Sequence, residues 1–183
     1  MPQTDLSLYN NSPFNPGGNA IKRLLWYYVN AVFLKSGLLP SSGLKVLLLR
    51  LFGAKIGKSV TIKPGVNVKY PWHLTIGNHT WLGENVWIDC LVAVTIGNNA
   101  CISQGATLLT GSHNYKKATF DLITGPVVLA DGVWIGAGAI VNLGVTAASH
   151  AVLTSGSVAT KNLEAYAIYQ GNPAVRVRER III

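Results

Sequence analysis

From Ile56 onward, aliphatic residues recur every six positions along the chain. The longest unbroken series is Leu129, Ile135, Val141, Ala147, Leu153 and Ala159. A step of six is three strand alternations, so these side chains all face the same way, whereas a helical period of 3.6 drifts against it. Glycine often follows the aliphatic position, as in IGKS, IGNH, LGEN and IGAG. Hexapeptide repeats of this kind predict a parallel β-helix, in which three hexapeptides form a triangular coil and stacked coils bury a shared core.

Two short interruptions break this period, and we interpret each as a phase slip of two residues. One lies after Val68, around YPWH, and the other between Val94 and Ile96. The repeat also sets the domain organisation that we predict. It consists of an N-terminal extension with amphipathic or apolar helices (1–55), the β-helix (56–163) and a C-terminal tail (164–183).

The third interruption is TGSHNYKKATFDLITGP, residues 110–126, which brings a histidine and several charges into an otherwise regular sequence. The step from Leu108 to Leu129 is 21 residues, where we expect 18. We therefore predict a protruding loop with three extra residues. Loops held on rigid scaffolds are preferred positions for chemistry, so this loop is the first candidate for a functional site.

The net charge of +8 is unevenly distributed. Residues 1–58 carry seven Lys and Arg against Asp5, residues 59–160 carry four basic and four acidic residues, and residues 161–183 carry four basic and two acidic ones. Basic ends around a neutral middle argue against a nucleic-acid groove along the whole protein. They favour two separate anionic partners, a membrane surface at one end and a phosphorylated ligand at the other.

Two N-terminal segments have the pattern of helices. The apolar run from Leu24 to Leu34 has basic residues on both sides, and its eleven residues fall short of the about 20 that span a bilayer. In LKVLLLRLF, leucines share one helical face, with Lys45 and Arg50 off it. Either these helices pack on the domain and cap it, or they form an interfacial membrane anchor with basic residues toward the lipid headgroups.

We expect a cytoplasmic protein, with a possible position at the inner face of the membrane. The N-terminus lacks the charged and apolar regions of a secretory signal. The two cysteines, Cys90 and Cys101, are too few for a disulfide framework, and we expect both to be buried free thiols. There is no CxxC and no Cys/His cluster with zinc-ligand spacing, so the sequence predicts no metal site.

The repeat, the His-bearing loop, and the stretches DGVWIGAGAIVNLGVT and GSVATKNLEAYAIYQGNPAVRVRE resemble the hexapeptide-repeat O-acetyltransferases. The N-terminal WYYVNAVFLKSGLLPSSGLKVLLLRLFGAKIG is similar to the branch that acetylates sugars in exopolysaccharide synthesis, of the colanic-acid type. This resemblance implies an all-β fold built on a left-handed parallel β-helix, against the usual right-handed crossover rule. It also implies a homotrimer, with acetyl-CoA bound between subunits and a sugar or glycolipid as acceptor.

Acetyl transfer from a thioester to a hydroxyl requires little beyond deprotonation of that hydroxyl and alignment of the two partners. A neutral imidazole can accept the proton. His113 follows TGS where the chain leaves the coil, and it matches the family's catalytic histidine within GSHNY, so we predict that it is the general base. We expect His79 and His150 to be solvated turn residues, and His73, beside Trp72, to be a packing or surface residue.

Direct transfer in a ternary complex is favoured over a covalent acetyl-enzyme, because no Cys or Ser lies in a nucleophile-elbow context. Glu84, Asp89 or a backbone carbonyl could orient the His113 ring. Asn85 and Asp89 are the candidate acceptor-binding residues, although Asn85 could equally be a turn residue. The maltose and galactoside enzymes use an Asn at the position that Gly83 occupies here, which suggests a different acceptor.

The resemblance also assigns six residues to the coenzyme. They are Ala137 and Ser155 along the pantetheine, Thr160 and Lys161 near the adenine and phosphate end, and Arg176 and Arg178 after the closing QGNP turn. Small side chains allow close backbone approach but also suit tight coils, and the basic ones would bind the 3′-phosphate unless they are ordinary surface charges. Arg176 is shifted by one position from the family pattern.

Two other functions remain open. A γ-type carbonic anhydrase on the same fold needs three histidines around zinc at the subunit borders, and His79, His113 and His150 lack the expected spacing. The other alternative is a non-catalytic trimeric scaffold that binds membranes or partners.

Overall fold

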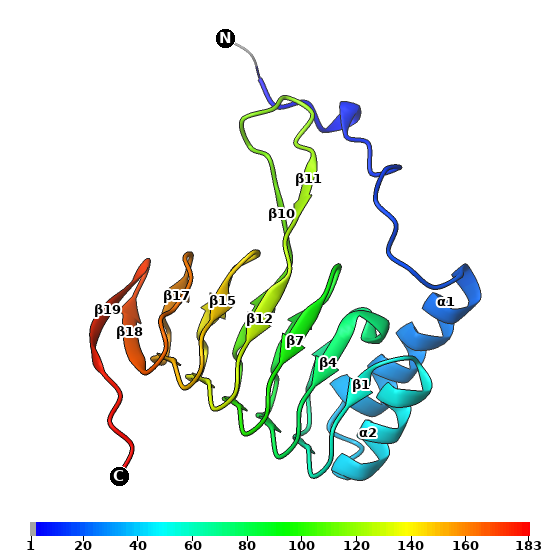
Figure 1. Cartoon of the computed structure of the whole chain (residues 1–183). Helices are drawn as coiled ribbons and strands as arrows, with labels where there is room; N and C mark the ends of the chain where they lie inside the picture. Colours follow the sequence, from blue (N-terminus) through cyan, green and yellow to red (C-terminus); the bar gives the residue numbers. More distant parts are fainter. Residues whose placement is uncertain (1–2) are drawn as a thin grey trace.

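The computed structural model describes residues 3–183 and shows a solenoid of short parallel strands stacked along one axis (Figure 1). Its strands form three sheets, which we call faces A, B and C in the order in which the chain visits them. Face A consists of β1 (Lys55–Ile56), β4 (Leu74–Ile76), β7 (Val94–Ile96), β12 (Val127–Leu129) and β15 (Thr146–Ala147).

Face B contains β2 (Thr61–Ile62), β5 (Trp81–Leu82), β8 (Cys101–Ile102), β13 (Trp134–Ile135), β16 (Val152–Leu153), β18 (Ala167–Gly171) and β19 (Ala174–Glu179). Face C contains β3 (Asn67–Val68), β6 (Trp87–Asp89), β9 (Thr107–Leu109), β14 (Ile140–Val141) and β17 (Val158–Ala159). All ladders within these faces are parallel except β18–β19, an antiparallel hairpin at the C-terminal end. The repeat therefore builds the predicted parallel β-helix.

The core contains two inward-facing residues per hexapeptide. The predicted aliphatic positions are buried along the coils, from Ile62 to Ala159. The residue two positions earlier is buried as well, and in several coils it is small, as at Ala100, Ala106, Ala139, Ala151 and Ser157. Both positions point inward because strand side chains alternate with a period of two.

The register between coils corrects the predicted length of the loop. Uninterrupted coils pair residues 18 apart, as Val128 pairs with Thr146, whereas Thr95 pairs with Val128, 33 positions on. The excursion therefore adds 15 residues to its coil and not three. The prediction of three was wrong because Leu108 lies on face C and Leu129 on face A, the next face, which an uninterrupted chain reaches in six residues.

All the interruptions lie at one edge of the prism, the corner between faces C and A (the C–A corner). The first slip is in the short 3-10 helix η3 (Pro71–His73), as predicted. The second is not between Val94 and Ile96, since both are buried on β7, and its extra residues fall at the corner between β6 and β7. The long excursion leaves the coil at the same corner, between β9 and β12.

The corner between faces A and B is held by a ladder of side-chain amides. Asn78 Oδ1 accepts a hydrogen bond from the Lys58 N–H, Asn98 Oδ1 from the Asn78 N–H, and Asp131 Oδ1 from the Asn98 N–H, at 2.7–2.8 Å. The hydrogen bond from the Asn98 N–H is the main cause that lowers the pKa of Asp131. This ladder explains why Asn or Asp recurs in IGNH, IGNN and the corresponding ADGV.

The N-terminal region contains a 3-10 turn, η1 (Leu6–Leu8), then α1 (Ala20–Val29), which continues into the π-helical η2 (Asn30–Lys35), and then α2 (Ser42–Leu51). These helices cover one end of the solenoid (Figure 1). Their side chains bond the open carbonyls of the first coil, as Arg50 does at Ile56 (2.8 Å) and Trp26 does at Val68 (2.8 Å). They therefore cap the free sheet edges, as the first of the two alternatives states, and this packing does not exclude the second one, because other side chains of the same helices stay exposed.

The face that α2 turns inward is unexpected. Lys45 is fully buried and donates to the Ile62 carbonyl at 3.3 Å, and its burial lowers its pKa. Leu44, Leu47 and Leu51, which share the predicted apolar face, are instead exposed.

The two cysteines differ in environment. Cys90 is fully buried at the C–A corner, where burial raises the pKa of its thiol to about 12. Cys101 is partly exposed on β8, because it occupies the outward-facing position of that strand. The prediction of two buried thiols is thus correct for Cys90 and wrong for Cys101.

Candidate active site

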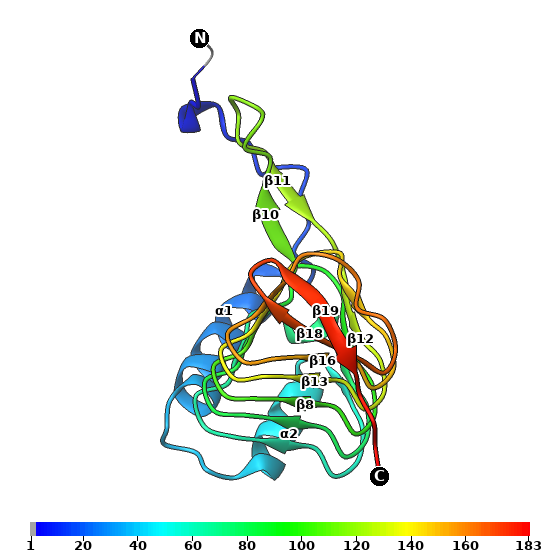
Figure 2. The ribbon, with the colours of Figure 1, turned by 90° about the vertical axis from the view of Figure 1, so that its left-hand side faces the viewer.

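A hairpin projects from the C–A corner and carries the predicted catalytic histidine. It consists of β10 (Gly111–His113) and β11 (Leu122–Thr124), which pair antiparallel and extend well beyond the solenoid (Figure 2). At its base, Thr110 Oγ1 bonds to the Asp89 carbonyl and accepts from the Leu91 N–H. Near its tip, the N-terminal segment runs alongside, with the Asp5 N–H donating to the Ala118 carbonyl at 2.9 Å.

The His113 ring is held in one orientation by the hairpin itself. Its Nδ1 lies 2.9 Å from the Phe120 carbonyl, and its ring stacks on Phe120 at 4.5 Å between centroids and 6° between planes. A carbonyl oxygen can only accept, so Nδ1 carries a proton, and in the neutral ring the lone pair is then on Nε2. Of the partners left open by the sequence, it is a backbone carbonyl that bonds this ring, while Glu84 lies at a different corner, between β5 and β6.

His113 lines a hollow of about 320 Å³ at the base of the hairpin. Asp89 lines the same hollow; it is 6% exposed and lies 3.2 Å from the ammonium group of Lys69. The remaining walls come from three parts of the chain far apart in sequence. They are Tyr9, Asn11 and Phe14 from the N-terminal segment, Lys69, Tyr70 and Leu91 from the C–A corner, and Gly111, Ser112 and Leu122 from the hairpin.

Asn85, the other candidate for acceptor binding, does not line this hollow. It lies at the corner between faces B and C (the B–C corner), in a left-handed turn with a φ of 58°. Its side chain packs where a Cβ on Gly65 would be, so within one chain Asn85 has the surroundings of a turn residue.

The other three histidines have separate environments. His73 Nε2 lies 3.1 Å from the Pro16 carbonyl, beside Trp72, as expected of a packing residue. His79 is exposed in a left-handed turn, as predicted. His150 also occupies such a turn, as predicted, but its side chain is only partly exposed because its ring stacks on Tyr166 at 4.7 Å. Within residues 3–183, no three His, Cys, Asp or Glu side chains gather as a metal-binding group would.

The predicted coenzyme residues fall into separate places on the chain. Ala137 and Ser155 are neighbours at the B–C corner, where the Gly156 N–H donates to the Ala137 carbonyl at 2.8 Å. Thr160 and Lys161 follow β17 at the C–A corner and are exposed.

The two arginines are exposed on β19, and Arg176 lies 3.5 Å from both Glu164 and Glu179. The fold brings Ala137 close to Ser155 but leaves both at a different corner from the one that carries the hairpin of His113.

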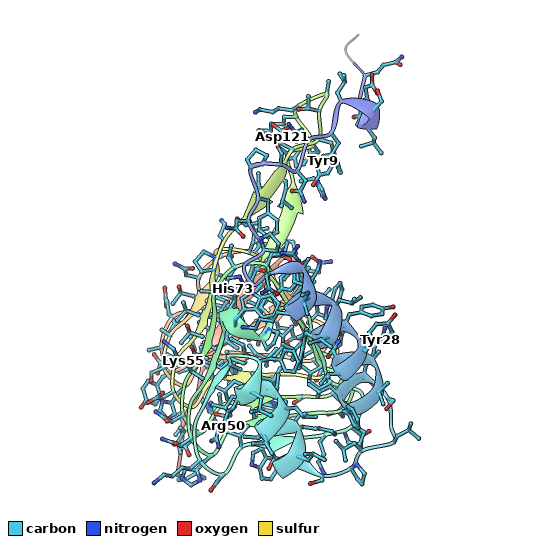
Figure 3. All side chains as sticks on the ribbon, turned by 90° about the vertical axis from the view of Figure 1, so that its right-hand side faces the viewer. Tyr9, Tyr28, Arg50, Lys55, His73 and Asp121 are labelled. Carbon is cyan, nitrogen blue, oxygen red and sulfur yellow. The ribbon has the colours of Figure 1, made fainter. Side chains whose placement is uncertain are left out.

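The walls contributed by Tyr9, Phe14 and Tyr70 were not identified from the sequence, and neither was the hydrogen bond from His113 to the Phe120 carbonyl. Tyr9 and His113 are about a hundred positions apart in the sequence, yet their ring centroids are 5.6 Å apart, because the N-terminal segment runs along the hairpin. In Figure 3, Tyr9 and Asp121 lie together on the projecting hairpin and the N-terminal segment beside it, apart from the body of the solenoid. No local pattern in the sequence predicts that contact.

Comparisons of the sequence with known proteins show which family the chain is similar to. An Escherichia coli (strain K12) protein named colanic acid biosynthesis acetyltransferase WcaF is 40% identical over 177 residues, 97% of each chain. The galactoside O-acetyltransferase of the same organism is 29% identical over 135 residues, 72% of this chain and 66% of that protein. No protein-family model matches the chain.

Solved structures agree in fold. A galactoside acetyltransferase in complex with coenzyme A has a TM-score of 0.77 at 27% identity, over 87% of this chain and 80% of that one. The acetyl-CoA complex of a hexapeptide-repeat acetyltransferase from Vibrio cholerae has a TM-score of 0.79 at 22% identity, over 88% of each chain. These likenesses confirm the left-handed parallel β-helix that the resemblance implied.

The chain therefore belongs to the hexapeptide-repeat acetyltransferases. Among the named relatives, it is the colanic acid biosynthesis acetyltransferase WcaF that it matches over nearly its whole length.

Proposed function

We propose that this protein transfers the acetyl group of acetyl-CoA to a hydroxyl of a sugar in polysaccharide biosynthesis, with His113 as general base. The observation that carries the proposal is the His113 ring, which bonds the Phe120 carbonyl through Nδ1 and lines a hollow of about 320 Å³. A hollow of this size suits a sugar unit. The match to WcaF supports the exopolysaccharide branch.

The reaction then proceeds in one ternary complex. His113 Nε2 accepts the proton of the sugar hydroxyl while the hydroxyl oxygen attacks the thioester carbonyl carbon. The C–S bond then breaks, and the imidazolium returns the proton to the sulfur of coenzyme A, which leaves as the thiol. The bond to the Phe120 carbonyl stabilises the imidazolium and keeps Nε2 directed at the substrate. Asp89 would bind a second hydroxyl of the sugar, because an ionised carboxylate only accepts hydrogen bonds.

The complete site needs two copies of the chain, and we propose a homotrimer. Within one chain the residues assigned to the pantetheine, Ala137 and Ser155, lie at the B–C corner, whereas His113 extends from the C–A corner. The hairpin of one subunit would reach the B–C corner of the next, a heterologous contact that closes into a ring. Thr160, Lys161, Arg176 and Arg178 would bind the adenine and 3′-phosphate end of the coenzyme.

The outward-facing side chains favour the same packing. Faces B and C, which flank the B–C corner, expose Trp81 (60%), Trp134 (45%) and Trp87 (40%). The outward positions of face A are mainly polar, with Lys55, Thr75, Thr95 and Thr146. Large exposed aromatic residues are typical of protein interfaces, so faces B and C are the sides that a neighbouring subunit would cover.

We place the reaction in the cytoplasm, where acetyl-CoA is made. Among residues 3–183, no helix reaches the length and apolarity that crossing a bilayer requires.

The test of this function is thiol release from acetyl-CoA with a panel of sugars and oligosaccharides. His113→Ala should lower turnover by about 10²–10⁴-fold, the usual contribution of a general base, with unchanged circular dichroism and mass. The matched control is His79→Asn, since Asn99 occupies the equivalent left-handed turn one coil later. Unchanged turnover in His113→Ala would rule out the mechanism, and no thiol release with any acceptor would favour the non-catalytic scaffold.

A further inference from the structure

The capped end of the solenoid presents an apolar surface that the fold leaves uncovered. Its members are the exposed side chains of Ile21, Leu24, Leu25 and Tyr28 on α1, Val32 and Phe33 on η2, and Leu44, Leu47 and Leu51 on α2. We call this set the apolar end face. Their exposed fractions run from 39% to 70%. Soluble proteins rarely expose so many large apolar side chains together, so this surface is built to be covered.

The spacing of these residues shows that the exposure follows a pattern. Ile21, Leu24, Leu25 and Tyr28 recur at helical intervals and form one stripe along α1. Leu44, Leu47 and Leu51 form a second stripe along α2, while Lys45 on the opposite side is buried against the first coil. In Figure 3 the two helices lie across the same end of the molecule, and the labelled Tyr28 points away from the core. Helix α2 therefore exposes leucines to solvent and buries a lysine against the solenoid.

The charge around this surface selects its partner. Residues 6–83 contain nine Lys and Arg residues and no Asp or Glu. Lys35, Lys55 and Lys58 are exposed near the capped end, at the close of η2 and in the first coil. A second copy of the chain would bring the same positive charges against them, which is unfavourable, whereas an anionic lipid surface is complementary to both the leucines and the lysines.

We infer that the apolar end face docks on an anionic membrane surface, with the leucines and Tyr28 inserted at the level of the headgroups and the lysines bonded to lipid phosphates. This is the geometry of an interfacial protein, not of one that crosses the bilayer. In this orientation the solenoid axis points away from the membrane surface, because the helices cover one end of the solenoid.

The proposed trimer would strengthen this contact. Rotation about a three-fold axis leaves every subunit's end pointing toward the same side of the ring, so three apolar end faces meet one membrane. Three linked weak contacts bind far more tightly than one. This step rests on the proposed trimer, whereas the surface itself is a property of the single chain.

Flotation with vesicles tests the inference. The full-length protein should bind phosphatidylcholine vesicles that contain roughly one-third phosphatidylglycerol at least about tenfold more tightly than pure phosphatidylcholine, and the preference should fall as salt rises to about 0.5 M. The variant Tyr28→Ser/Leu47→Gln/Leu51→Gln should bind the anionic vesicles at least about tenfold more weakly. The variant Lys35→Gln/Lys55→Gln/Lys58→Gln should lose the preference for anionic lipid.

The control is Ile181→Gln/Ile182→Gln/Ile183→Gln, which removes three exposed apolar side chains at the other end of the chain and should leave vesicle binding unchanged. Acetyl transfer to a water-soluble acceptor should be retained in the Tyr28/Leu47/Leu51 variant, so a loss of binding is separable from a failure of the proposed enzyme. Wild-type protein that fails to bind anionic vesicles, or a variant whose oligomeric mass falls while its binding persists, would overturn the inference; the latter result would assign this face to a second copy.

Discussion

At the scale of single residues, Asp89 is the side chain whose role can be measured separately from that of His113. Its carboxylate is buried, lines the hollow of His113 and lies 3.2 Å from the Lys69 ammonium group. Asp89→Asn keeps the shape of the side chain but replaces a charged acceptor with a neutral amide. We expect the KM for the sugar acceptor to rise about 10–150-fold, because hydrogen bonds to charged groups contribute about 1.5–3 kcal/mol, while the KM for acetyl-CoA stays unchanged.

The matched control is Asp121→Asn on the hairpin, where Asp121 forms an exposed ion pair with Lys117 at 2.8 Å. Exposed pairs contribute little, so neither KM should change. If Asp89→Asn instead shifts both KM values equally, or lowers only the folded fraction, the carboxylate is structural.

Single residues also show how far the sequence could identify the site. His113 could be found because it begins the one long break in a regular repeat and matches a family motif. The hydrogen bond from His113 to the Phe120 carbonyl could not be found, because the position of this carbonyl depends on how the hairpin turns back, with Phe120 itself in a left-handed conformation at a φ of 50°. Tyr9 and Phe14 could not, because their positions depend on tertiary contacts of the N-terminal segment.

At the scale of elements, the amide ladder at the A–B corner is a unit whose contribution can be tested. Asp131→Ala removes the acceptor for the Asn98 N–H and should lower the free energy of unfolding by about 1 kcal/mol, whereas Asp131→Asn keeps an oxygen there and should cost less. The pKa of Asp131 is lowered in the folded protein, so its charge stabilises the fold above the ordinary carboxyl pKa of 3.8.

That contribution is lost as the pH falls through the lowered pKa, so wild type and Asp131→Asn should differ in urea midpoint at pH 7 and converge in acid once the pH is below that lowered pKa. Since Asp131 is exposed, the difference should stay below about 1 kcal/mol. A gap that widens in acid would contradict this assignment.

The elements also show what periodicity can and cannot predict. A step of six determines which residues face the core, and the buried ladder confirms it from Ile62 to Ala159. The step does not state which face a residue occupies, so the length of the excursion between Leu108 and Leu129 was underestimated. In α2, the sequence identified the face that carries the leucines but not that this face is exposed. Lys45 faces the solenoid instead, because it donates a hydrogen bond to the open carbonyl of Ile62.

At the scale of the whole molecule, the proposed trimer can be tested because the C–A corner, which carries His113, and the B–C corner, which carries Ser155, are separate within one chain. If each site combines the His113 of one subunit with the B–C corner of the next, two inactive variants should restore each other when mixed. His113→Ala lacks the base, and Ser155→Trp blocks the pantetheine corner at an exposed position that tolerates a large side chain. Each variant alone should be inactive, for different reasons.

Mixed trimers formed by refolding or co-expression contain some sites with an intact His113 from one variant and an intact Ser155 corner from the other. With equal amounts and random assembly, both conditions hold at about a quarter of the sites, so activity should return to about a quarter of the wild-type value. Mixing two samples of the same variant is the control and should restore nothing. If mixtures of the two variants also stay inactive while mass measurements show mixed trimers, then base and coenzyme corner come from one chain, and the C–A hairpin must reach its own B–C corner.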